Sequence, residues 1–577
     1  MKTPSHSVIE KKKPIKKMAD INFNDFKVPY KINSKFKTKT AYMCMEFGID
    51  QALKIFSGGL GFLAGSHMRS AYELKQNMVG IGVLWKTGYY DQVRKGNREM
   101  DSLFLERNYN FLEDTGIRFD IKVHGHAVKV KAMYLAPEIF NTCPIFFLST
   151  DLPENDFLSR TIINRLYDNN VETKVAQCTL LGIGGVKLLE QLNWEPDTYH
   201  FNEAHALPAA FELYSKLGSV EAVKEKIVFT THTPVEAGNE KHNFDMLDRM
   251  SFFGDVPADE VRRITGTHGD IFNQTLVGLR LSRYANGVSE IHGHVAREMW
   301  DKHDDTCEIT HITNSQNHTY WHDAAYEAAF KAKDDKAYLA RKAEMKADAF
   351  KVVADQCGKL FDPSVLTLVW ARRFGAYKRP HLITQDFERF ERIVKNTKYP
   401  VQIIWAGKPY PQDYGAVEIW NNLAHLAKKY PNVAILTGYE LDLSKKLKAG
   451  SDVWLNNPRV PREASGTSGM TAAMLGSVNV STFDGWVPEF CKQGKNGWMI
   501  PKVDLSLPQH EQDIFDRDNM LDILENEVIP TYYDKPKTWL KIVKQAQKDV
   551  TPQFDSNRMA AEYYTKLYDK VVKVVEL

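Results

Sequence analysis

The stretch Pro461-Arg462-Glu463-Ala464-Ser465-Gly466-Thr467-Ser468-Gly469-Met470-Thr471-Ala472-Ala473-Met474 decides how this sequence is interpreted. It follows the apolar run Val453-Trp454-Leu455, which is typical of a buried strand in an α/β sheet, and it leads into residues of helical composition. The hydroxyl side chains and glycines between them leave backbone N–H groups free at a helix start, a position that attracts anions. A structural turn capped by Ser465 or Thr467 is the alternative interpretation.

Length and composition bound the class of protein. A chain of 577 residues is too long to fold around a single hydrophobic core, so we expect two or more domains. Hydrophobic residues make up 43% and charged residues 26%, as in globular proteins, and a net charge of +2 favours neither a nucleic-acid nor a membrane partner. The six cysteines lack metal-site spacing, and no apolar run suits a signal peptide or a membrane span. We therefore expect a cytoplasmic protein without a metal.

Short apolar runs alternate with helical stretches along most of the chain, which predicts an α/β fold with parallel sheets. We expect two Rossmann-like domains that face a central cleft, where the carboxyl ends of their strands bind ligands. The predicted segments are a flexible lysine-rich arm (1–39) that settles near Phe23 to Tyr30, a first domain (40–314), a helical connector (315–358), and a second domain (359–577) whose terminal helix, Asn557 to Val574, crosses back.

The expected strands follow from the apolar runs. In the first domain they are Ala41-Glu46, Val79-Trp85, Pro144-Ser149, Thr198-Phe201, Ile227-Thr230 and Gly287-Ser289. In the second domain they are Leu366-Trp370, Val401-Trp405, Val433-Leu436, Val453-Leu455 and Val478-Thr482. The main helices of the first domain are expected at Val171-Leu192 and Leu207-Lys216.

Several loops after these strands carry groups suited to chemistry. Gly58 and Gly59 permit close approach of an oxygen-rich ligand at a helix start, although glycines often serve packing alone. Glu203 and His205 suit an acid/base pair, or they cap the helix and satisfy one another. His232 in Thr230-Thr231-His232-Thr233-Pro234 is either a ligand contact or a buried structural histidine.

The strongest of these segments is Arg372-Arg373-Phe374-Gly375-Ala376-Tyr377-Lys378-Arg379, directly after the run Leu366-Trp370. Four cations and a tyrosine at the end of a buried strand predict a phosphate site, because arginine makes bidentate contacts to phosphate oxygens and lysine adds a point charge. A solvated basic surface is a weaker explanation, since the cations follow a strand of buried type.

Together these motifs resemble the α-glucan (glycogen, starch and maltodextrin) phosphorylase family in its short form, from about Ala41 to Trp486. The resemblance rests on the motif Glu463-Ala464-Ser465-Gly466-Thr467, on the cation loop, and on the segment Ile312 to Trp321. It implies a GT-B type architecture. It also assigns roles to residues. The implied catalytic residues are Arg373, Lys378, Glu463 and His232, the substrate-binding residues are Gly58, Gly59, Asn314, Glu203, His205, Ser465, Gly466 and Thr467, and the cofactor-binding residues are Arg372, Tyr377, Tyr439, Trp321 and Thr471.

The sequence departs from the family pattern at two positions. The family has a lysine at the position of Thr471, and that lysine carries pyridoxal phosphate as a Schiff base. Threonine has no amine, and the closest lysines along the chain are Lys448 and Lys492. Ser315 replaces a family glycine, which predicts a change in how closely the backbone approaches the sugar.

The resemblance implies retaining transfer of glucosyl units between an α-1,4-glucan and phosphate, with glucose 1-phosphate as the product. Pyridoxal phosphate would then bind without a covalent bond to Thr471. Two alternatives stay open, namely a transferase that takes a nucleotide sugar in the same phosphate sites, and a non-catalytic protein that binds glucans or malto-oligosaccharides. A hydrolase that uses Glu203 and Glu463 would leave the phosphate site unused. The family also implies a homodimer.

Overall fold

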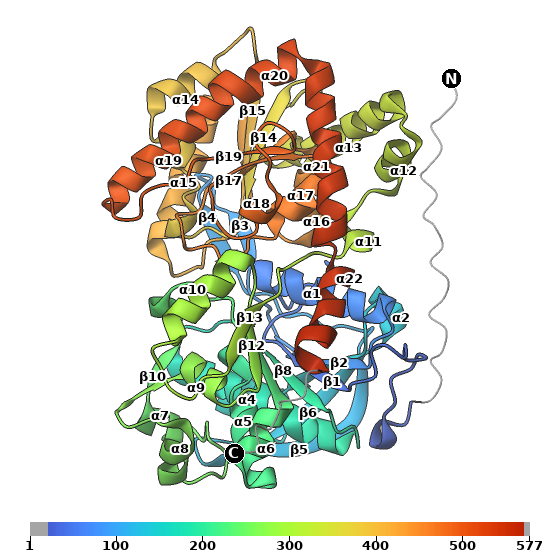
Figure 1. Cartoon of the computed structure of the whole chain (residues 1–577), viewed down its shortest axis with the longest axis vertical. Coiled ribbons are helices and arrows are strands. Elements are labelled where there is room, and N and C mark those ends of the chain that lie inside the picture. Colours follow the sequence, from blue (N-terminus) through green and yellow to red (C-terminus); the bar gives the residue numbers. More distant parts are fainter. Residues whose placement is uncertain (1–20, 570–577) are drawn as a thin grey trace.

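The computed structural model describes residues 21–569 (Figure 1). Most of the predicted arm (residues 1–20) and the end of the predicted terminal helix (570–577) lie outside the described residues. Within the described part of the arm, Phe23 and Phe26 are buried and meet Tyr134 and Phe146 edge to face. These ring contacts attach the segment to the first sheet.

The first half of the chain is built on a nine-stranded sheet in the order β13-β12-β9-β8-β1-β2-β7-β6-β5. Its parallel strands are β1 (Thr40–Met43), β2 (Met78–Val83), β7 (Ile145–Ser149), β8 (Thr198–Asn202), β9 (Ile227–Thr230), β12 (Tyr284–Gly287) and β13 (Glu308–His311). The antiparallel strands β5 (Glu113–Val123) and β6 (His126–Leu135) extend one edge.

The second half contains a six-stranded parallel sheet in the order β16-β15-β14-β17-β18-β19. Its strands are β14 (Leu366–Ala371), β15 (Val401–Ala406), β16 (Val433–Leu436), β17 (Val453–Asn456), β18 (Val478–Ser481) and β19 (Gly497–Met499). Counted along the chain, the parallel strands follow the order 3-2-1-4-5-6-7 in the first sheet and 3-2-1-4-5-6 in the second, and 3-2-1-4-5-6 is an order of doubly wound α/β sheets. The predicted α/β class is confirmed.

Some strands differ from the expectation. The predicted strand Gly287-Ser289 is wrong in its bounds, because β12 ends at Gly287 and Ser289 caps α10 (Glu290–Trp300) by accepting a hydrogen bond from the His292 N–H at 3.1 Å. A serine hydroxyl satisfies a free helix N–H, so it ends a strand readily before a helix. The prediction also omitted β5, β6, β13, β19 and the hairpin of β3 (Asp91–Arg94) and β4 (Met100–Leu103).

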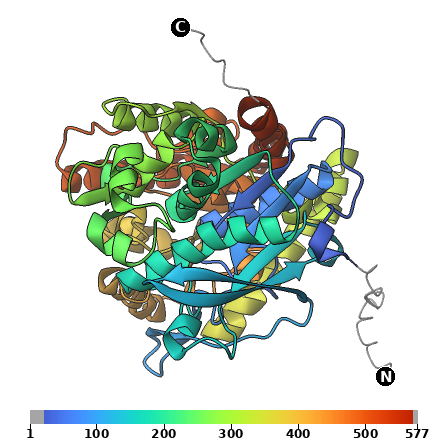
Figure 2. The ribbon, with the colours of Figure 1, turned by 90° about the horizontal axis from the view of Figure 1, so that it is seen from below.

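Helices surround both sheets, and Figure 2 shows α4 lying across the first sheet. In the first half they are α1 (Gly59–Glu73), α2 (Pro137–Phe140), α3 (Phe157–Thr161), α4 (Val171–Gln191), α5 (Pro208–Leu217), α6 (Val220–Lys226), α7 (Phe244–Arg249), α8 (Ala258–Thr265), α9 (Gln274–Arg280) and α10. From residue 318 onward they are α11 (His318–Trp321), α12 (Ala324–Ala332), α13 (Asp335–Cys357), α14 (Phe387–Val394), α15 (Tyr414–Lys429), α16 (Leu441–Gly450), α17 (Ser468–Met474), α18 (Val487–Phe490), α19 (Gln509–Ile523), α20 (Ile529–Asp534), α21 (Pro536–Phe554) and α22 (Ser556–Tyr563). None of the described helices combines the length and apolarity that crossing a bilayer requires.

Two elements tie the halves together (Figure 1). The terminal helix α22 returns to the first half and packs against α1, where the Ser556 and Ser70 hydroxyls lie 2.6 Å apart. In the opposite direction, the β3–β4 hairpin reaches the second half, where the Gln92 amide donates to the Gly407 carbonyl at 3.0 Å. These contacts connect the two halves of the chain.

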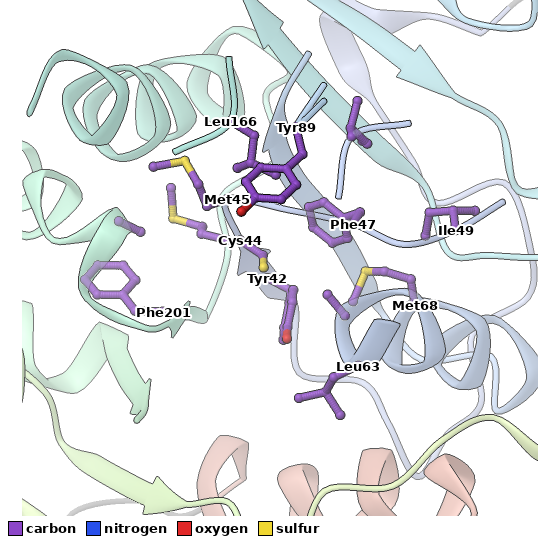
Figure 3. Close-up of a cluster of buried hydrophobic side chains, with 14 of the residues drawn as sticks. Tyr42, Cys44, Met45, Phe47, Ile49, Leu63, Met68, Tyr89, Leu166 and Phe201 are labelled. Carbon is purple, nitrogen blue, oxygen red and sulfur yellow. The ribbon is translucent and has the colours of Figure 1, made fainter. Parts of the chain in front are cut away.

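The core beneath the first sheet positions the start of α1 (Figure 3). Tyr42 and Phe47 from the β1 region face Leu63 and Met68 from α1, and all four side chains are buried. A Cβ atom at Gly65 would lie 2.0 Å from the Gly48 carbonyl oxygen, so only glycine lets α1 approach this closely. This packing holds the first residues of α1 at the carboxyl end of β1.

The carboxyl ends of α16 and α17 share a buried cation from α13. The Lys342 ammonium donates to the Ala449 carbonyl at 2.8 Å and to the Leu475 carbonyl at 3.0 Å. Carbonyls at a helix end have no partner within the helix, and the helix dipole favours a cation there. Lys342 thus holds the two helices beside one another.

Candidate active site

A cavity of about 510 Å³ lies between the two sheets. Most of its lining comes from segments that follow β1, β9 and β13 in the first sheet and β14 to β17 in the second. These loops leave the carboxyl ends of parallel strands, where α/β sheets bind ligands. Of the predicted site residues, the cavity is lined by Gly58, Gly59, His232, Asn314, Arg372, Arg373, Tyr377, Lys378, Tyr439, Glu463, Ser465, Gly466 and Thr467.

The loop after β14 supplies the cations of the cavity. The Arg372 side chain is buried, and its Nη2 donates to the Ser468 hydroxyl at 3.1 Å, while its Nε and Nη1 have no hydrogen-bond partner among the described residues. Arg373 is exposed into the cavity, and Lys378 is buried beside it. Unused guanidinium donors at a buried position fit a phosphate ligand.

Glu463 lies against these cations. Its carboxylate forms an ion pair with Lys378 and a longer one with Arg372, whose Nη1 is 3.5 Å from Oε2. Burial raises the pKa of this carboxyl, but Lys378 and Arg372 lower it more, so the net pKa is below its usual value and Glu463 is ionised at neutral pH. Gly466 has a φ of 85°, and a Cβ there would lie 3.1 Å from the Glu463 side chain, so the loop requires glycine.

Asp484 supports the same loop from behind. Its carboxylate accepts hydrogen bonds from the N–H groups of Glu463 and Gly485, each at 2.9 Å. Burial, followed by the charge of Glu463, raises the pKa of Asp484 to about 8. Asp484 is therefore mostly protonated at neutral pH.

Two neutral polar atoms of the cavity wall are buried without a partner among the described residues. They are the side-chain oxygen of Asn314 and the hydroxyl of Ser465. Buried polar atoms are normally hydrogen-bonded, so unsatisfied ones that line a cavity mark places where a ligand completes the bonds. Thr467 precedes α17, makes no capping hydrogen bond, and accepts one from Gln316 at 3.1 Å. The alternative interpretation, in which the Thr467 side chain caps a structural turn, is therefore not supported.

His232 is held as a neutral imidazole. Its Nε2 lies 2.7 Å from the Asn202 side-chain oxygen, which can only accept, so Nε2 carries the proton and Nδ1 is left as an acceptor. Burial lowers the pKa of His232 to about 3. The backbone N–H of His232 donates to the Glu203 carboxylate.

Glu203 and His205 lie outside the cavity lining. The Glu203 carboxylate accepts from the Ala204 N–H at 3.4 Å and from the Thr233 hydroxyl at 3.1 Å, so it caps the short helical turn that follows. No hydrogen bond joins Glu203 to His205 within the described chain, and His205 Nδ1 is buried without a partner there. The geometry favours the helix-cap interpretation of Glu203, with His232 and Thr233 in place of His205 as its partners.

The glycine loop before α1 is held by Glu46, which the sequence interpretation did not single out. The Glu46 carboxylate accepts from the N–H groups of Ser57 and Gly58 at 2.6 and 3.2 Å and from the Tyr167 hydroxyl at 2.8 Å. A Cβ atom at Gly59 would meet nothing within 4 Å, so α1 presents an open backbone surface to the cavity.

The cavity also has a more apolar part, formed by Phe62, Tyr439 and Lys448 with Trp321 behind them. Thr471 lies outside the lining and is fully buried, and its hydroxyl donates to the Ser468 carbonyl at 3.1 Å. Trp321 is also behind the lining, where its indole N–H donates to the Gln316 side chain at 2.9 Å. Ser315 is buried away from the cavity, and its hydroxyl accepts a hydrogen bond from Arg558.

Several lining residues were not predicted as site residues, namely Glu46, Tyr89, Tyr167, Lys174, Gln316, Lys408, Tyr410, Lys448 and Arg462. Glu46, Gln316 and Arg462 lie within segments that the sequence analysis quoted. Lys448 had a signal of a different kind, because it is one of the two lysines closest along the chain to Thr471.

The fold and this cavity define an α/β protein with a cation-lined cavity at the carboxyl ends of the parallel strands of two sheets. A family model described as carbohydrate phosphorylase matches residues 275–497. An uncharacterized protein of Methanocaldococcus jannaschii is 43% identical over 92% of this chain and 99% of its own length. Maltodextrin phosphorylase of Thermococcus litoralis is 33% identical over 93% of this chain and 71% of its own length, and glycogen phosphorylase of Aquifex aeolicus is 31% identical over 94% and 88%.

The chain therefore belongs to the carbohydrate phosphorylase family, as its motifs predicted. This membership places it among proteins of the glycosyltransferase type in carbohydrate metabolism.

Proposed function

We propose that this protein is an α-glucan phosphorylase, which moves glucosyl units between an α-1,4-glucan and phosphate and so forms or uses glucose 1-phosphate. The observation that carries the proposal is the set of unsatisfied buried polar atoms on one cavity, namely Arg372 Nε and Nη1, Asn314 Oδ1 and Ser465 Oγ. Guanidinium donors suit phosphate, and the amide and hydroxyl oxygens suit sugar hydroxyls. The relatives named as maltodextrin and glycogen phosphorylases support the same assignment.

The proposal includes a GT-B architecture of two Rossmann-like domains that face the cavity. The common strand order of the two sheets and the position of the cavity at their carboxyl ends support it. In this arrangement each domain contributes one side of the reaction, with the sugar bound mainly by the first and the phosphate by the second.

The phosphate side is assigned to Arg373 and Lys378. Arg373 projects into the cavity and has no carboxylate within 4 Å among the described residues, so its charge is available to a ligand. Retaining glucosyl transfer develops negative charge on the leaving group, and fixed cations stabilise that charge most strongly in a site shielded from water. Lys378 is paired with Glu463 and would share its charge between that carboxylate and the phosphate.

The sugar side is assigned to His232, Asn314 and Glu463. The free Nδ1 of neutral His232 and the oxygen of Asn314 are both acceptors, so each is able to accept a hydrogen bond from a sugar hydroxyl. The ionised Glu463 carboxylate adds a stronger acceptor and places negative charge near the positive charge that develops on the sugar.

The residues present also fit pyridoxal phosphate, the cofactor that the family implies. Arg372 has unused donors, Tyr439 offers a hydroxyl, and Phe62, backed by Trp321, gives the cavity an apolar wall suited to a pyridine ring. When bound, the cofactor would place its own phosphate group beside the substrate phosphate, and its aldehyde would serve only for attachment to the protein. The family's anchoring residue is absent, since Thr471 has no amine.

The test is an assay of the purified protein with maltodextrin and orthophosphate. We expect release of glucose 1-phosphate that requires both substrates and depends on added pyridoxal phosphate in protein stripped of it. Transfer from a nucleotide-linked glucose without any phosphate-dependent release would contradict the proposal and favour the nucleotide-sugar transferase. Binding of maltodextrin without either reaction would leave the non-catalytic binding protein.

A further inference from the structure

Lys448 is a cavity residue to which the proposed function gives no role. Lys448 lies near the end of α16, is 1% exposed, and lines the cavity. Within the described residues its ammonium nitrogen makes no hydrogen bond and no ion pair. Its contacts are aromatic, at 3.9 Å from the centroid of the Trp321 ring, 5.8 Å from Phe62 and 6.0 Å from Trp454.

The other buried lysines of the described chain are all satisfied. Lys342 donates to two helix-end carbonyls, and Lys346 pairs with Asp452. Lys378 pairs with Glu463, and Lys408 pairs with Glu440. A buried amine without such partners is costly, so Lys448 is expected to have a use that only a ligand reveals.

The surroundings of Lys448 make its amine a nucleophile. A lysine reacts with a carbonyl only as the neutral amine, and the neutral form is favoured by removal from water and by a neighbouring cation. Both conditions hold here, because burial, followed by the charge of Arg372, places the pKa of Lys448 well below its usual value. The same cavity wall contains Tyr439 and the unused donors of Arg372, which the proposed function assigns to the cofactor.

The location also fits the missing anchor. Lys448 in α16 contacts Trp321 of α11, and α17, which carries Thr471, packs against the same α11. The two helices are neighbours whose ends share Lys342. An amine on α16 therefore enters the part of the cavity beside the family's lysine position, while the Thr471 side chain stays buried behind it.

We propose that Lys448 replaces the family lysine as the covalent anchor of pyridoxal phosphate, because its partnerless amine enters the cofactor side of the cavity from the neighbouring helix. This inference rests on the proposed function as far as the cofactor is concerned. It differs from non-covalent binding, which the threonine alone would imply.

The bond forms by condensation and needs no oxidant or reductant. The lone pair of the neutral Lys448 nitrogen adds to the aldehyde carbon of pyridoxal phosphate. The aldehyde oxygen then leaves as water with the two amine protons, so that a carbon–nitrogen double bond replaces the carbon–oxygen double bond. Borohydride reduces this double bond to a stable secondary amine.

The experiment is to incubate the full-length protein with pyridoxal phosphate, reduce it with borohydride, digest it, and locate the modified lysine by peptide mass. We expect the phosphopyridoxyl group on Lys448 and an absorbance band of the bound imine before reduction. Lys448→Met should remove the label and weaken retention of the cofactor through dialysis at least tenfold. Lys448→Arg keeps a long basic side chain and should lose the label like the methionine variant, because a guanidinium does not form this bond.

Lys446→Met is the matched control. Lys446 lies on the same helix, is exposed, and has Asp348 at 4.0 Å, so its loss should leave labelling unchanged. Near-native melting temperatures of the Lys448 variants would show that they fold. A label on a different lysine, or cofactor that binds without any reducible bond, would overturn the Lys448 assignment while phosphate-dependent release of glucose 1-phosphate would still uphold the proposed function. Absence of cofactor binding would overturn the assignment as well, and the release assay would then judge the proposed function separately.

Discussion

Helices α16 and α17 bound the same side of the cavity, but they differ in what they contribute. α17 follows the motif that dominates the sequence, yet Thr471 on it is buried, hydrogen-bonded within its own helix, and outside the cavity lining. α16 has no recognisable motif, yet Lys448 on it enters the cavity with an unpaired amine. The motif before α17 therefore predicts where this backbone lies, but it does not predict that the amine in the cavity comes from α16.

The loop after β14 is a useful contrast to both helices. Its cations are contiguous in the sequence, follow a buried strand, and line the cavity together. Lys448 acts alone and depends on the packing of α16 against α11, which a single sequence does not display.

The largest effect is expected at the contiguous loop. Arg373→Ala removes the exposed guanidinium assigned to the reacting phosphate and should lower kcat/KM for glucose 1-phosphate release by about a thousandfold, which is typical of a lost charge-stabilising donor. The melting temperature should change little, because Arg373 is exposed into the cavity. Turnover within tenfold of the unmodified protein would show that the phosphate is bound elsewhere.

The second prediction moves the anchor between the two helices. Side chains of a helix tilt toward its N-terminus, and Ser468, three residues before Thr471 on the same face, lines the cavity. A longer side chain at position 471 should therefore reach the cavity. In the double variant Lys448→Met, Thr471→Lys we expect borohydride to fix the cofactor to residue 471, with at least a tenfold gain in retention over Lys448→Met alone. A double variant that folds and binds the cofactor but takes no label at 471 would break the comparison between α16 and α17.

The third prediction concerns Ser315, which departs from the family pattern as Thr471 does but lies away from the cavity. Ser315 lies away from the cavity, and its hydroxyl accepts from Arg558, which also donates to the Thr313 carbonyl at 2.8 Å. Ser315→Gly should therefore cost about 1 kcal/mol of unfolding free energy through the lost hydrogen bond. Activity should stay within twofold, measured as glucose 1-phosphate release. A large gain or loss of activity would place Ser315 among the residues that shape the sugar site.

Much of the molecule was predictable from the sequence for physical reasons. Buried strands of a parallel sheet are short apolar runs, so β14 to β18 were all expected close to their observed bounds. The antiparallel strands β5 and β6 were missed, because buried residues in them alternate with more exposed ones, as in surface segments.

The candidate site shows a similar division. Contiguous groups such as Arg372, Arg373 and Lys378 were identified together with the strand that they follow, and they line one cavity. Partners brought by tertiary packing were missed, as with Asp484 behind Glu463 and Glu46 beneath the glycine loop. Lys448 was noted only as a distant neighbour along the chain, because nothing in its local pattern distinguishes an amine directed into a cavity from one on a helix surface.

The last prediction concerns the cost of keeping Lys448 unpaired on α16, which has no counterpart at Thr471 on α17. In cofactor-free protein, prepared by exchange with hydroxylamine, Lys448→Met should be more stable than the unmodified protein at pH 7, by about 1–3 kcal/mol, since methionine fills a similar volume without a polar group. The pKa of Lys448 is lowered in the folded state by burial and by Arg372, whereas an unfolded lysine titrates near pH 10. Between these two values the unfolded chain binds a proton that the folded chain does not, so the stability of the unmodified protein rises with pH and the advantage of methionine shrinks toward pH 10.

Melting temperatures from pH 7 to pH 10 measure this convergence, and Lys446→Met, which removes an exposed amine from the same helix, should show none of it. A constant difference across that range would mean that Lys448 has the same pKa when folded and unfolded, and the chemical reason for placing the anchor on α16 would then be lost.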